Sequence, residues 1–228
     1  MMEFLFLDLD DTILDFHKAE RIALAKTLES FDVAPEDELL ARYHVINRQH
    51  WERLETGELT RDQVQEGRFR VLFQELGRTV DPVQVTRTYE RNLGIGHYFL
   101  PGAEEAVQSL HKKYRLFLAS NGTASVQHSR LTSAGLYPYF EKVFVSQEIG
   151  YNKPTRDYFE ACFRQIPDFC PERAIMVGDS LTSDILGGIN AGIRTCWVNP
   201  SHAPARANIQ PDYEIENLSQ LEEVLKTL

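Results

Sequence analysis

Two aspartates two residues apart, Asp8 and Asp10, follow a short apolar run near the start of the chain. If the backbone stays extended, their side chains point to the same side, because side chains alternate along a strand. One carboxylate could then attack a phosphoryl group while the other moves protons to the leaving oxygen and from water. Taken alone, Asp8-Leu9-Asp10-Asp11-Thr12 is more typical of an acidic turn that caps a helix. Its interpretation therefore depends on the rest of the sequence.

Three further polar groups follow predicted strands later in the chain. They are Ser120-Asn121-Gly122, Asn152-Lys153-Pro154, and Gly178-Asp179-Ser180 with Asp184. Because the carboxyl ends of parallel strands meet at one edge of a sheet, we expect all of these groups to lie together with the first two aspartates. Four such groups in one place favour a reaction centre over an isolated turn.

The second and third groups contain donors suited to the oxygens of a phosphoryl group. Ser120, the main-chain N–H groups of Asn121 and Gly122, and Lys153 would hold the three equatorial oxygens. Together with an aspartate nucleophile, they predict hydrolysis in two displacements through an aspartyl-phosphate.

The carboxylates at this edge would repel one another, since only one lysine accompanies them. Oxygen ligands without a nearby histidine or cysteine indicate a hard divalent cation, and carboxylates combined with a substrate phosphate are typical of Mg²⁺. Mn²⁺ would suit the same oxygens. The sequence predicts a metal site formed by Asp8, Asp10, Asp179 and Asp184.

The elements that position these groups alternate along the chain. Short apolar runs typical of buried strands lie at residues 4–7, 116–119, 143–145, 174–177 and 195–198. Helical periodicity lies between them, at residues 103–112, 124–134, 156–166 and 183–191. The alternation predicts a doubly wound α/β fold, with a parallel sheet covered on both faces. The acidic stretch 214–223 is interpreted as the solvated face of a last short helix.

Residues 17–99 show only helical periodicity and separate the first strand from the others. Helix starts are indicated at Pro35, at the capping box Thr60–Gln63 and at Asp81-Pro82. We therefore expect residues 1–16 and 100–228 to form the catalytic core, with an all-helical cap of roughly four helices inserted at 17–99. Such a cap would lie over the carboxyl end of the first strand, joined by hinges at its two boundaries.

Composition limits the partners. The 228 residues are 43% hydrophobic and 25% charged, as in ordinary globular proteins, and 24 basic against 34 acidic residues give a net charge of −10. That sign argues against a nucleic-acid or anionic-membrane surface and leaves a small phosphate ester as the expected partner, with the protein a monomer or homodimer.

The three cysteines, Cys162, Cys170 and Cys196, have no paired spacing and are expected to be packing residues in a reducing compartment. With no basic leader segment before the first strand, the expected location is the cytoplasm.

The four groups resemble, in order and spacing, the four motifs of the haloacid dehalogenase-like hydrolase superfamily. That resemblance covers the whole chain, because the helical insertion resembles the cap of the superfamily. It implies that Asp8 is the nucleophile, Asp10 the acid/base, and Ser120 and Lys153 phosphate ligands. It also implies that Mg²⁺ is bound by Asp8, the main-chain carbonyl of Asp10 and Asp179, with Asp184 in a water-mediated or supporting role.

The second aspartate favours a phosphatase within the superfamily. Dehalogenases of the superfamily, which need neither metal nor leaving-group acid, usually lack a residue equivalent to Asp10. Phosphonatases use a cap lysine for which this chain has no obvious candidate. The substrate is therefore expected to be a phosphate monoester.

A narrower resemblance is to bacterial pyrimidine 5'-nucleotidases that act on deoxyuridine, thymidine and modified pyrimidine monophosphates. It lies in Asn47-Arg48-Gln49-His50-Trp51, Gly57-Glu58-Leu59-Thr60, Gly67-Arg68-Phe69 and Asp184–Gly192. It implies that Trp51 or Phe69 stacks on a base while Asn47 or Arg68 hydrogen-bonds its edge. Packing in the core of the cap is an equal alternative for the two aromatic residues.

The expected function is hydrolysis of (deoxy)pyrimidine nucleoside 5'-monophosphates. A sugar-phosphate or phosphoglycolate-type phosphatase is the alternative within enzymes. A phosphate-responsive regulator without turnover is a further alternative, which the complete acid/base pair disfavours. A two-component receiver is disfavoured because its acceptor aspartate follows a later strand.

Overall fold

The computed structural model describes residues 2–228, which form two compact units. The sheet unit contains the described residues up to Phe16 together with His97–Leu228, and the helical unit contains His17–Gly96. Phe99, near the boundary, bridges to Leu14 within the sheet unit. The chain thus leaves the sheet unit after its first strand and returns to it about eighty residues later.

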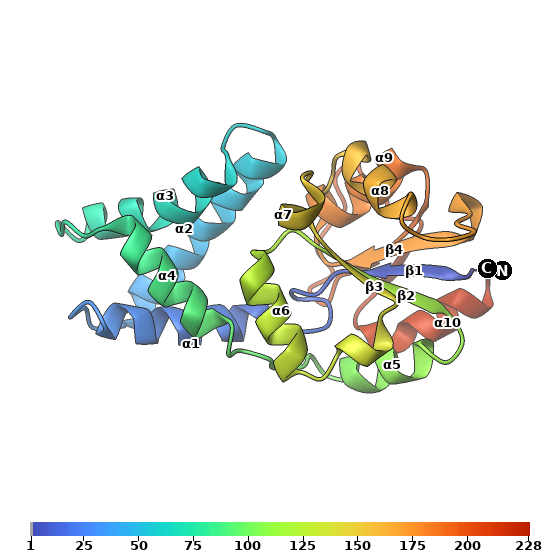
Figure 1. Ribbon diagram of the computed structural model, residues 1–228, viewed down its shortest axis with the longest axis horizontal. Coiled ribbons are helices and arrows are strands. Elements are labelled where there is room, and N and C mark those ends of the chain that lie inside the picture. The colour runs from blue at the N-terminus through green and yellow to red at the C-terminus, as the bar shows by residue number, and fades with distance from the viewer. Residues whose placement is uncertain (1) are drawn as a thin grey trace. The chain divides into compact units, whose positions relative to one another are not determined.

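The sheet unit contains a six-stranded parallel sheet in the order β3-β2-β1-β4-β5-β6 (Figure 1). The strands are β1 (Phe4–Leu7), β2 (Arg115–Ser120), β3 (Lys142–Val145), β4 (Ala174–Gly178), β5 (Arg194–Val198) and β6 (Tyr213–Ile215). Successive strands are added first on one side of β1 and then on the other. The crevice at such a reversal is where open α/β sheets bind their ligands.

Strand β1 is buried on both faces because every residue in it is apolar. Phe4 and Phe6 point into an aromatic cluster with Phe117 and Phe144. Leu5 and Leu7 point into an aliphatic cluster on the other face of the sheet. The predicted doubly wound α/β fold is confirmed.

Helices cover both faces of this sheet. α8 (Arg156–Phe163) and α9 (Leu186–Ala191) lie on one side, and α5 (Ala103–Leu110) and α10 (Leu221–Lys226) lie on the other (Figure 1). The remaining helical elements are α6 (Ala124–Ser133), α7 (Ser146–Ile149), the 3₁₀ turns η1 (Tyr137–Tyr139), η2 (Pro171–Arg173) and η4 (Leu218–Gln220), and the π-helical turn η3 (Leu181–Ile185).

The interpretation of residues 214–223 as one helix is wrong at its start. Tyr213–Ile215 forms strand β6, which pairs with β5, and α10 begins only at Leu221. The segment forms a strand because Ile215 packs into the aliphatic cluster while Glu214 is exposed. Three residues are too few for this alternation to be recognised in the sequence.

The helical unit consists of α1 (Phe16–Glu29), α2 (Asp37–Glu55), α3 (Arg61–Glu75) and α4 (Pro82–Leu93). The first residue of α1, Phe16, still belongs to the sheet unit. The predicted capping box at the start of α3 is confirmed, and Asp81 caps α4 as the Asp81-Pro82 pair predicts. Tyr43, Phe69 and Tyr89 pack together with ring centroids 5.2–5.7 Å apart. Phe69 is therefore part of the core of this unit.

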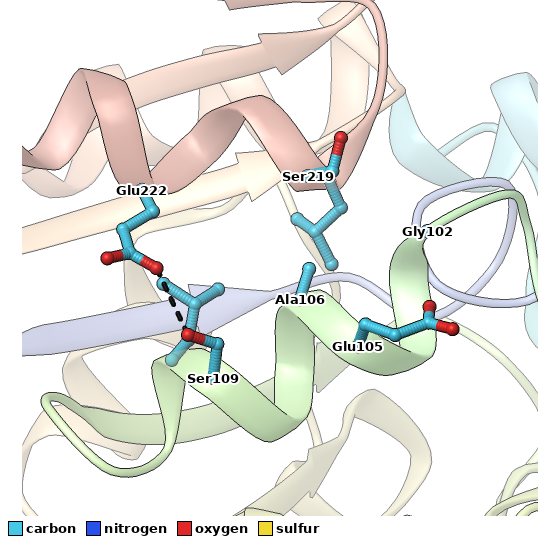
Figure 2. Close-up of a pocket in the computed structure, with 8 residues that line it drawn as sticks. Gly102, Glu105, Ala106, Ser109, Ser219 and Glu222 are labelled. Carbon is cyan, nitrogen blue, oxygen red and sulfur yellow. Dashed lines mark hydrogen bonds between the residues drawn. The ribbon is translucent and has the colours of Figure 1, made fainter.

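A pocket of about 410 Å³ lies in the sheet unit where α5 meets η4 and α10 (Figure 2). Figure 2 shows Ser109 donating to Glu222, an interaction of 3.0 Å. The residues that line this pocket include none of the predicted site residues. Within residues 2–228, no helix combines the length and the apolar composition needed to cross a bilayer.

The three cysteines are free thiols in different environments. Cys162 packs in the aromatic cluster and Cys196 in the aliphatic one, whereas Cys170 is half-buried and contacts Glu172. Burial raises the pKa of both the Cys162 and the Cys196 thiol to about 12.

A thiol reagent tests this difference. Since the thiolate is the reactive species, we expect the native protein to react rapidly at Cys170 alone, and at all three cysteines after denaturation. The measurement is thiol titration with a disulfide reagent, with Cys170→Ser as the control. Rapid native labelling of Cys170→Ser would contradict the packing seen here.

Candidate active site

The carboxyl end of β1 places Asp8 at the centre of the sheet edge. Leu7 pairs with Leu118 of β2 and Val177 of β4, and the N–H of Asp8 donates to the carbonyl of Val177 over 2.9 Å. Asp8 is 7% exposed. A buried carboxylate at this position requires compensating charge.

Lys153 supplies that charge from the loop between α7 and α8. Its ammonium donates to Asp8 Oδ1 over 2.7 Å, to Asp184 Oδ1 over 2.6 Å and to the carbonyl of Ala119 over 2.6 Å. These three acceptors use the three N–H donors of the buried side chain. Although burial alone would lower the pKa of Lys153, the adjacent Asp184 and Asp8 carboxylates raise it above its usual value. The lysine therefore stays charged.

Asp184 lies on the π-helical turn η3 rather than on the regular helix predicted over 183–191. Both Asp184 N–H and Ile185 N–H donate to the carbonyl of Ser180, which widens the turn and brings the Asp184 carboxylate back to accept from Ser180 N–H over 3.1 Å. Gly178 makes room for it, since a Cβ there would lie 2.2 Å from Asp184 Oδ2. π-turns of this kind are frequent at functional sites.

Asp8, Asp179 and Asp184 form a cluster in which one carboxylate oxygen from each lies within 4.8 Å of the others. Burial raises the pKa of Asp8 to about 8 and that of Asp179 well above its usual range, and the neighbouring carboxylates add to both shifts. One ammonium leaves three carboxylates with negative charge in excess. The donor set thus fits a hard divalent cation, as predicted, and these three side chains are the ones that would hold it.

Asn121 fixes the lysine loop to the end of β2. Its Oδ1 accepts from Lys153 N–H over 2.9 Å, and its Nδ2 donates to the Lys153 carbonyl over 2.9 Å and to Ser183 Oγ over 3.2 Å. The side chain of this predicted phosphate-binding residue thus positions Lys153. Its main-chain N–H remains the predicted phosphate donor.

Ser120 is buried at the end of β2, next to Gly122. Its Oγ accepts from Gly122 N–H over 3.1 Å and from the side-chain amide of Gln127 over 2.8 Å. Since a hydroxyl has two acceptor lone pairs, both are used, and the hydroxyl hydrogen is oriented to donate. Gly122 is required here because a Cβ would lie 2.4 Å from Gln127 Nε2.

Asp10 is half-buried, and its carboxylate points to α6. Gln127 Nε2 donates to Asp10 Oδ2 over 2.7 Å, and Arg130 forms an ion pair with Asp10 Oδ1. Sequence reasoning missed both α6 residues. Their i, i+3 spacing directly after the Ser120-Asn121-Gly122 group was the available signal, because it places them on one helix face.

The predicted base-binding residues of the helical unit belong to a polar network. Asn47 is buried, its Nδ2 donates to Glu20 over 2.6 Å, and its Oδ1 accepts from Arg68 over 2.8 Å and from Trp51 over 3.1 Å. Arg68 is also buried and packs on Phe69. Trp51 is half-buried. The structure thus brings Asn47, Trp51 and Arg68 together, and their role toward a substrate stays a prediction.

A second cluster of metal-ligand types, His17, Glu20 and His44, lies in the same unit. Both Glu20 oxygens are already engaged, Oε2 by His44 Nδ1 over 2.7 Å and Oε1 by Asn47. We therefore interpret the contacts of His44 and Asn47 with Glu20 as hydrogen bonds that compensate the buried Glu20 carboxylate.

Fold and site together place an aspartate cluster at the edge of a doubly wound sheet where the strand order reverses. A family profile for haloacid dehalogenase-like hydrolases matches residues 2–192, and the chain belongs to that family. It is accordingly an enzyme, and its relatives make it a hydrolase of the phosphatase type.

Three relatives cover nearly the whole chain. The hydrolase YfnB of Bacillus subtilis is 39% identical over 97% of this chain and 94% of its own. Its crystal structure, described as bound to magnesium and as revealing interdomain movement, superposes with a TM-score of 0.94 and covers 98% of each chain. The pyrimidine 5'-nucleotidase PynA of Streptococcus pneumoniae is 37% identical, covering 96% of this chain and 93% of its own. The pyrimidine 5'-nucleotidase YjjG of Escherichia coli is 30% identical, covering 98% and 97%.

Removal of the buried ammonium tests the charge balance. We expect Lys153→Met to lower the free energy of unfolding by about 3 kcal/mol, because two buried carboxylates lose their partner. The measurement is urea denaturation in EDTA. Arg156→Met, which breaks an exposed ion pair with Glu160, is the control and should change stability by less than about 0.5 kcal/mol. Equal losses in the two variants would contradict the assigned role of Lys153.

Proposed function

We propose that the protein is a magnesium-dependent phosphatase that forms an aspartyl-phosphate and acts on (deoxy)pyrimidine nucleoside 5'-monophosphates. The observation that carries the proposal is the contact of the Lys153 ammonium with both Asp8 and Asp184, beside a third carboxylate at the carboxyl edge of the sheet. This arrangement supports a carboxylate nucleophile beside a cation-dependent phosphate site.

Asp8 is the nucleophile in this proposal. Its carboxylate oxygen bonds to phosphorus as the ester P–O bond breaks, and Asp10 gives a proton to the departing alkoxide. Asp10 then takes a proton from the water that attacks the aspartyl-phosphate, which releases inorganic phosphate and restores Asp8. Ser120 and the main-chain N–H of Asn121 would hold the phosphoryl oxygens, and Lys153 and the Gly122 N–H would join them by each giving up one of the contacts described above.

Asp8, Asp179 and Asp184 would hold the Mg²⁺, together with the main-chain carbonyl of Asp10. Bound there, the cation would neutralise the carboxylates and the charge of the phosphoryl group. The description of the YfnB crystal structure as magnesium-bound supports this choice of metal.

The helical unit acts as a cap that selects the substrate in this proposal. Support comes from the two nucleotidase relatives, which cover nearly all of the chain including this unit, and from the interdomain movement described for YfnB. Trp51 would stack on the base, with its ring held by the hydrogen bond from Trp51 Nε1 to Asn47. Asn47 or Arg68 would hydrogen-bond the edge of the base. Cap closure would exclude water from the reaction.

The proposed location is the cytoplasm, because free thiols such as these three are typical of a reducing compartment.

A substrate panel tests the proposed activity. We expect phosphate release to be fastest with dUMP or dTMP, slower with sugar phosphates and phosphoglycolate, and abolished by EDTA. Asp8→Asn should reduce release at least ~10⁴-fold while retaining the far-UV circular dichroism of the wild type, since it removes the nucleophile.

Each other outcome has a definite meaning. A preference for a sugar phosphate would retain the chemistry and reject the nucleotidase assignment. Full activity in EDTA would reject the metal, and turnover by Asp8→Asn would reject the nucleophile. No release from any ester would favour a regulator.

Truncation of Trp51 tests base stacking. Because a base–aromatic contact contributes about 1–3 kcal/mol, Trp51→Ala should raise KM for dTMP by about 5- to 150-fold. It should leave KM for p-nitrophenyl phosphate, which lacks a pyrimidine, within about threefold. Parallel changes for the two substrates in steady-state kinetics would show that Trp51 is only a packing residue.

A further inference from the structure

We propose that Gln127 and Arg130 of α6 are positioning residues that hold Asp10 in the orientation needed to protonate the leaving oxygen. The inference rests on the proposed function, in which Asp10 is the acid/base. Both residues lie in the sheet unit, as do all their partners described below.

The Gln127 side chain has a single orientation consistent with its contacts. Its Nε2 donates to Asp10 Oδ2 over 2.7 Å and to Ser120 Oγ over 2.8 Å, while its Oε1 accepts from Arg130 over 3.1 Å. Rotating the amide by half a turn would place its oxygen against the Asp10 carboxylate, which cannot donate, and its NH₂ against the Arg130 guanidinium, which cannot accept. Gln127 is 1% exposed, so water cannot take over these contacts.

Arg130 is fully buried, which is costly for an arginine unless its charge is compensated. Asp10 provides that compensation through an ion pair with the Arg130 guanidinium. The guanidinium also lies 5.9 Å from the ring centroid of Phe16. A charge placed at this cost and directed at one aspartate fixes where that carboxylate lies.

The amide of Gln127 also ties the acid/base to the phosphate-binding loop. Ser120 would hold an oxygen on the same phosphorus that carries the leaving oxygen. Since one NH₂ group holds both Ser120 and Asp10, the proton donor is kept at a fixed position relative to the bond that breaks. Gly122 serves the same contact, because any Cβ there would displace the amide.

This arrangement predicts losses that depend on the leaving group. An alkoxide needs a proton as it departs, whereas a nitrophenolate is stable without one. If Gln127 and Arg130 act through Asp10, their removal should slow hydrolysis of alkyl esters far more than that of activated aryl esters. A purely structural role would slow both equally.

The test compares benzyl phosphate with p-nitrophenyl phosphate, which are similar in size and carry no nucleoside. We expect Gln127→Leu to lower kcat/KM about 100-fold for benzyl phosphate and less than fivefold for p-nitrophenyl phosphate. kcat/KM is the relevant constant because it covers steps up to departure of the leaving group. Arg130→Met should show the same selectivity, and Gln127→Leu carries the test where Arg130→Met does not fold.

Tyr158→Phe is the matched structural control. It removes another buried hydrogen bond, of 2.8 Å to the carbonyl of Phe144, away from Asp10. We expect it to lower the melting temperature about as much as Gln127→Leu while changing kcat/KM for the two esters by the same factor. Equal factors for the two esters in Gln127→Leu as well would overturn the proposal.

Asp10→Asn separates failure of this inference from failure of the proposed function. If Asp10→Asn itself shows no selective loss on benzyl phosphate, the acid/base assignment is wrong. If it does, adding Gln127→Leu to Asp10→Asn should lower kcat/KM for benzyl phosphate less than threefold further, because both changes remove one function. A full additional 100-fold loss would show that Gln127 acts independently of Asp10.

Discussion

The structure depends on one buried ammonium group that compensates carboxylates where the sheet reverses its order. Lys153 contacts three segments. It binds Asp8 after β1, the Ala119 carbonyl near the end of β2, and Asp184 on the π-turn after β4. Without that cation, the carboxylates would face one another in an environment that already disfavours their charge. The three segments that form the site are therefore held together by electrostatics as well as by packing.

The parallel sheet explains why these groups meet although they are far apart in the sequence. Strands β2, β1 and β4 are neighbours, so Ser120 and Gly178, which end β2 and β4, and Asp8, which directly follows β1, lie at the same edge. Rigid strands, buried on both faces, set the positions of the first polar residues beyond them. The loops that follow add only what strands cannot provide, such as the cis Lys153-Pro154 segment and the π-turn.

Much of this arrangement could be predicted from the sequence because it follows from strand ends. Apolar runs identify the strands, and parallel topology then brings the residues after them together. Contacts made by helix faces could not be predicted in this way. The partner of Arg130 depends on how α6 docks on the sheet, and the network of Asn47 with Glu20, Arg68 and Trp51 depends on the packing of α1, α2 and α3. The three-residue strand β6 is too short for its alternation to stand out from the acidic residues around it.

Two aspartates separated by one residue have different environments, and this difference supports the roles proposed for them. Asp8 is buried beside other carboxylates, where burial raises its pKa to about 8 although Lys153 opposes the shift, so a bound cation would be needed to keep it ionised for the proposed attack. Asp10 is half-buried and faces Gln127 and Arg130, and in the proposed mechanism it exchanges protons with the departing group and with water. Proteins that use two carboxylates for separate steps commonly separate their roles by such differences in surroundings. The two carboxylates are near enough for the charge of Asp10 to add to the rise in the pKa of Asp8, and the groups on β2, α6 and the lysine loop make their surroundings unequal.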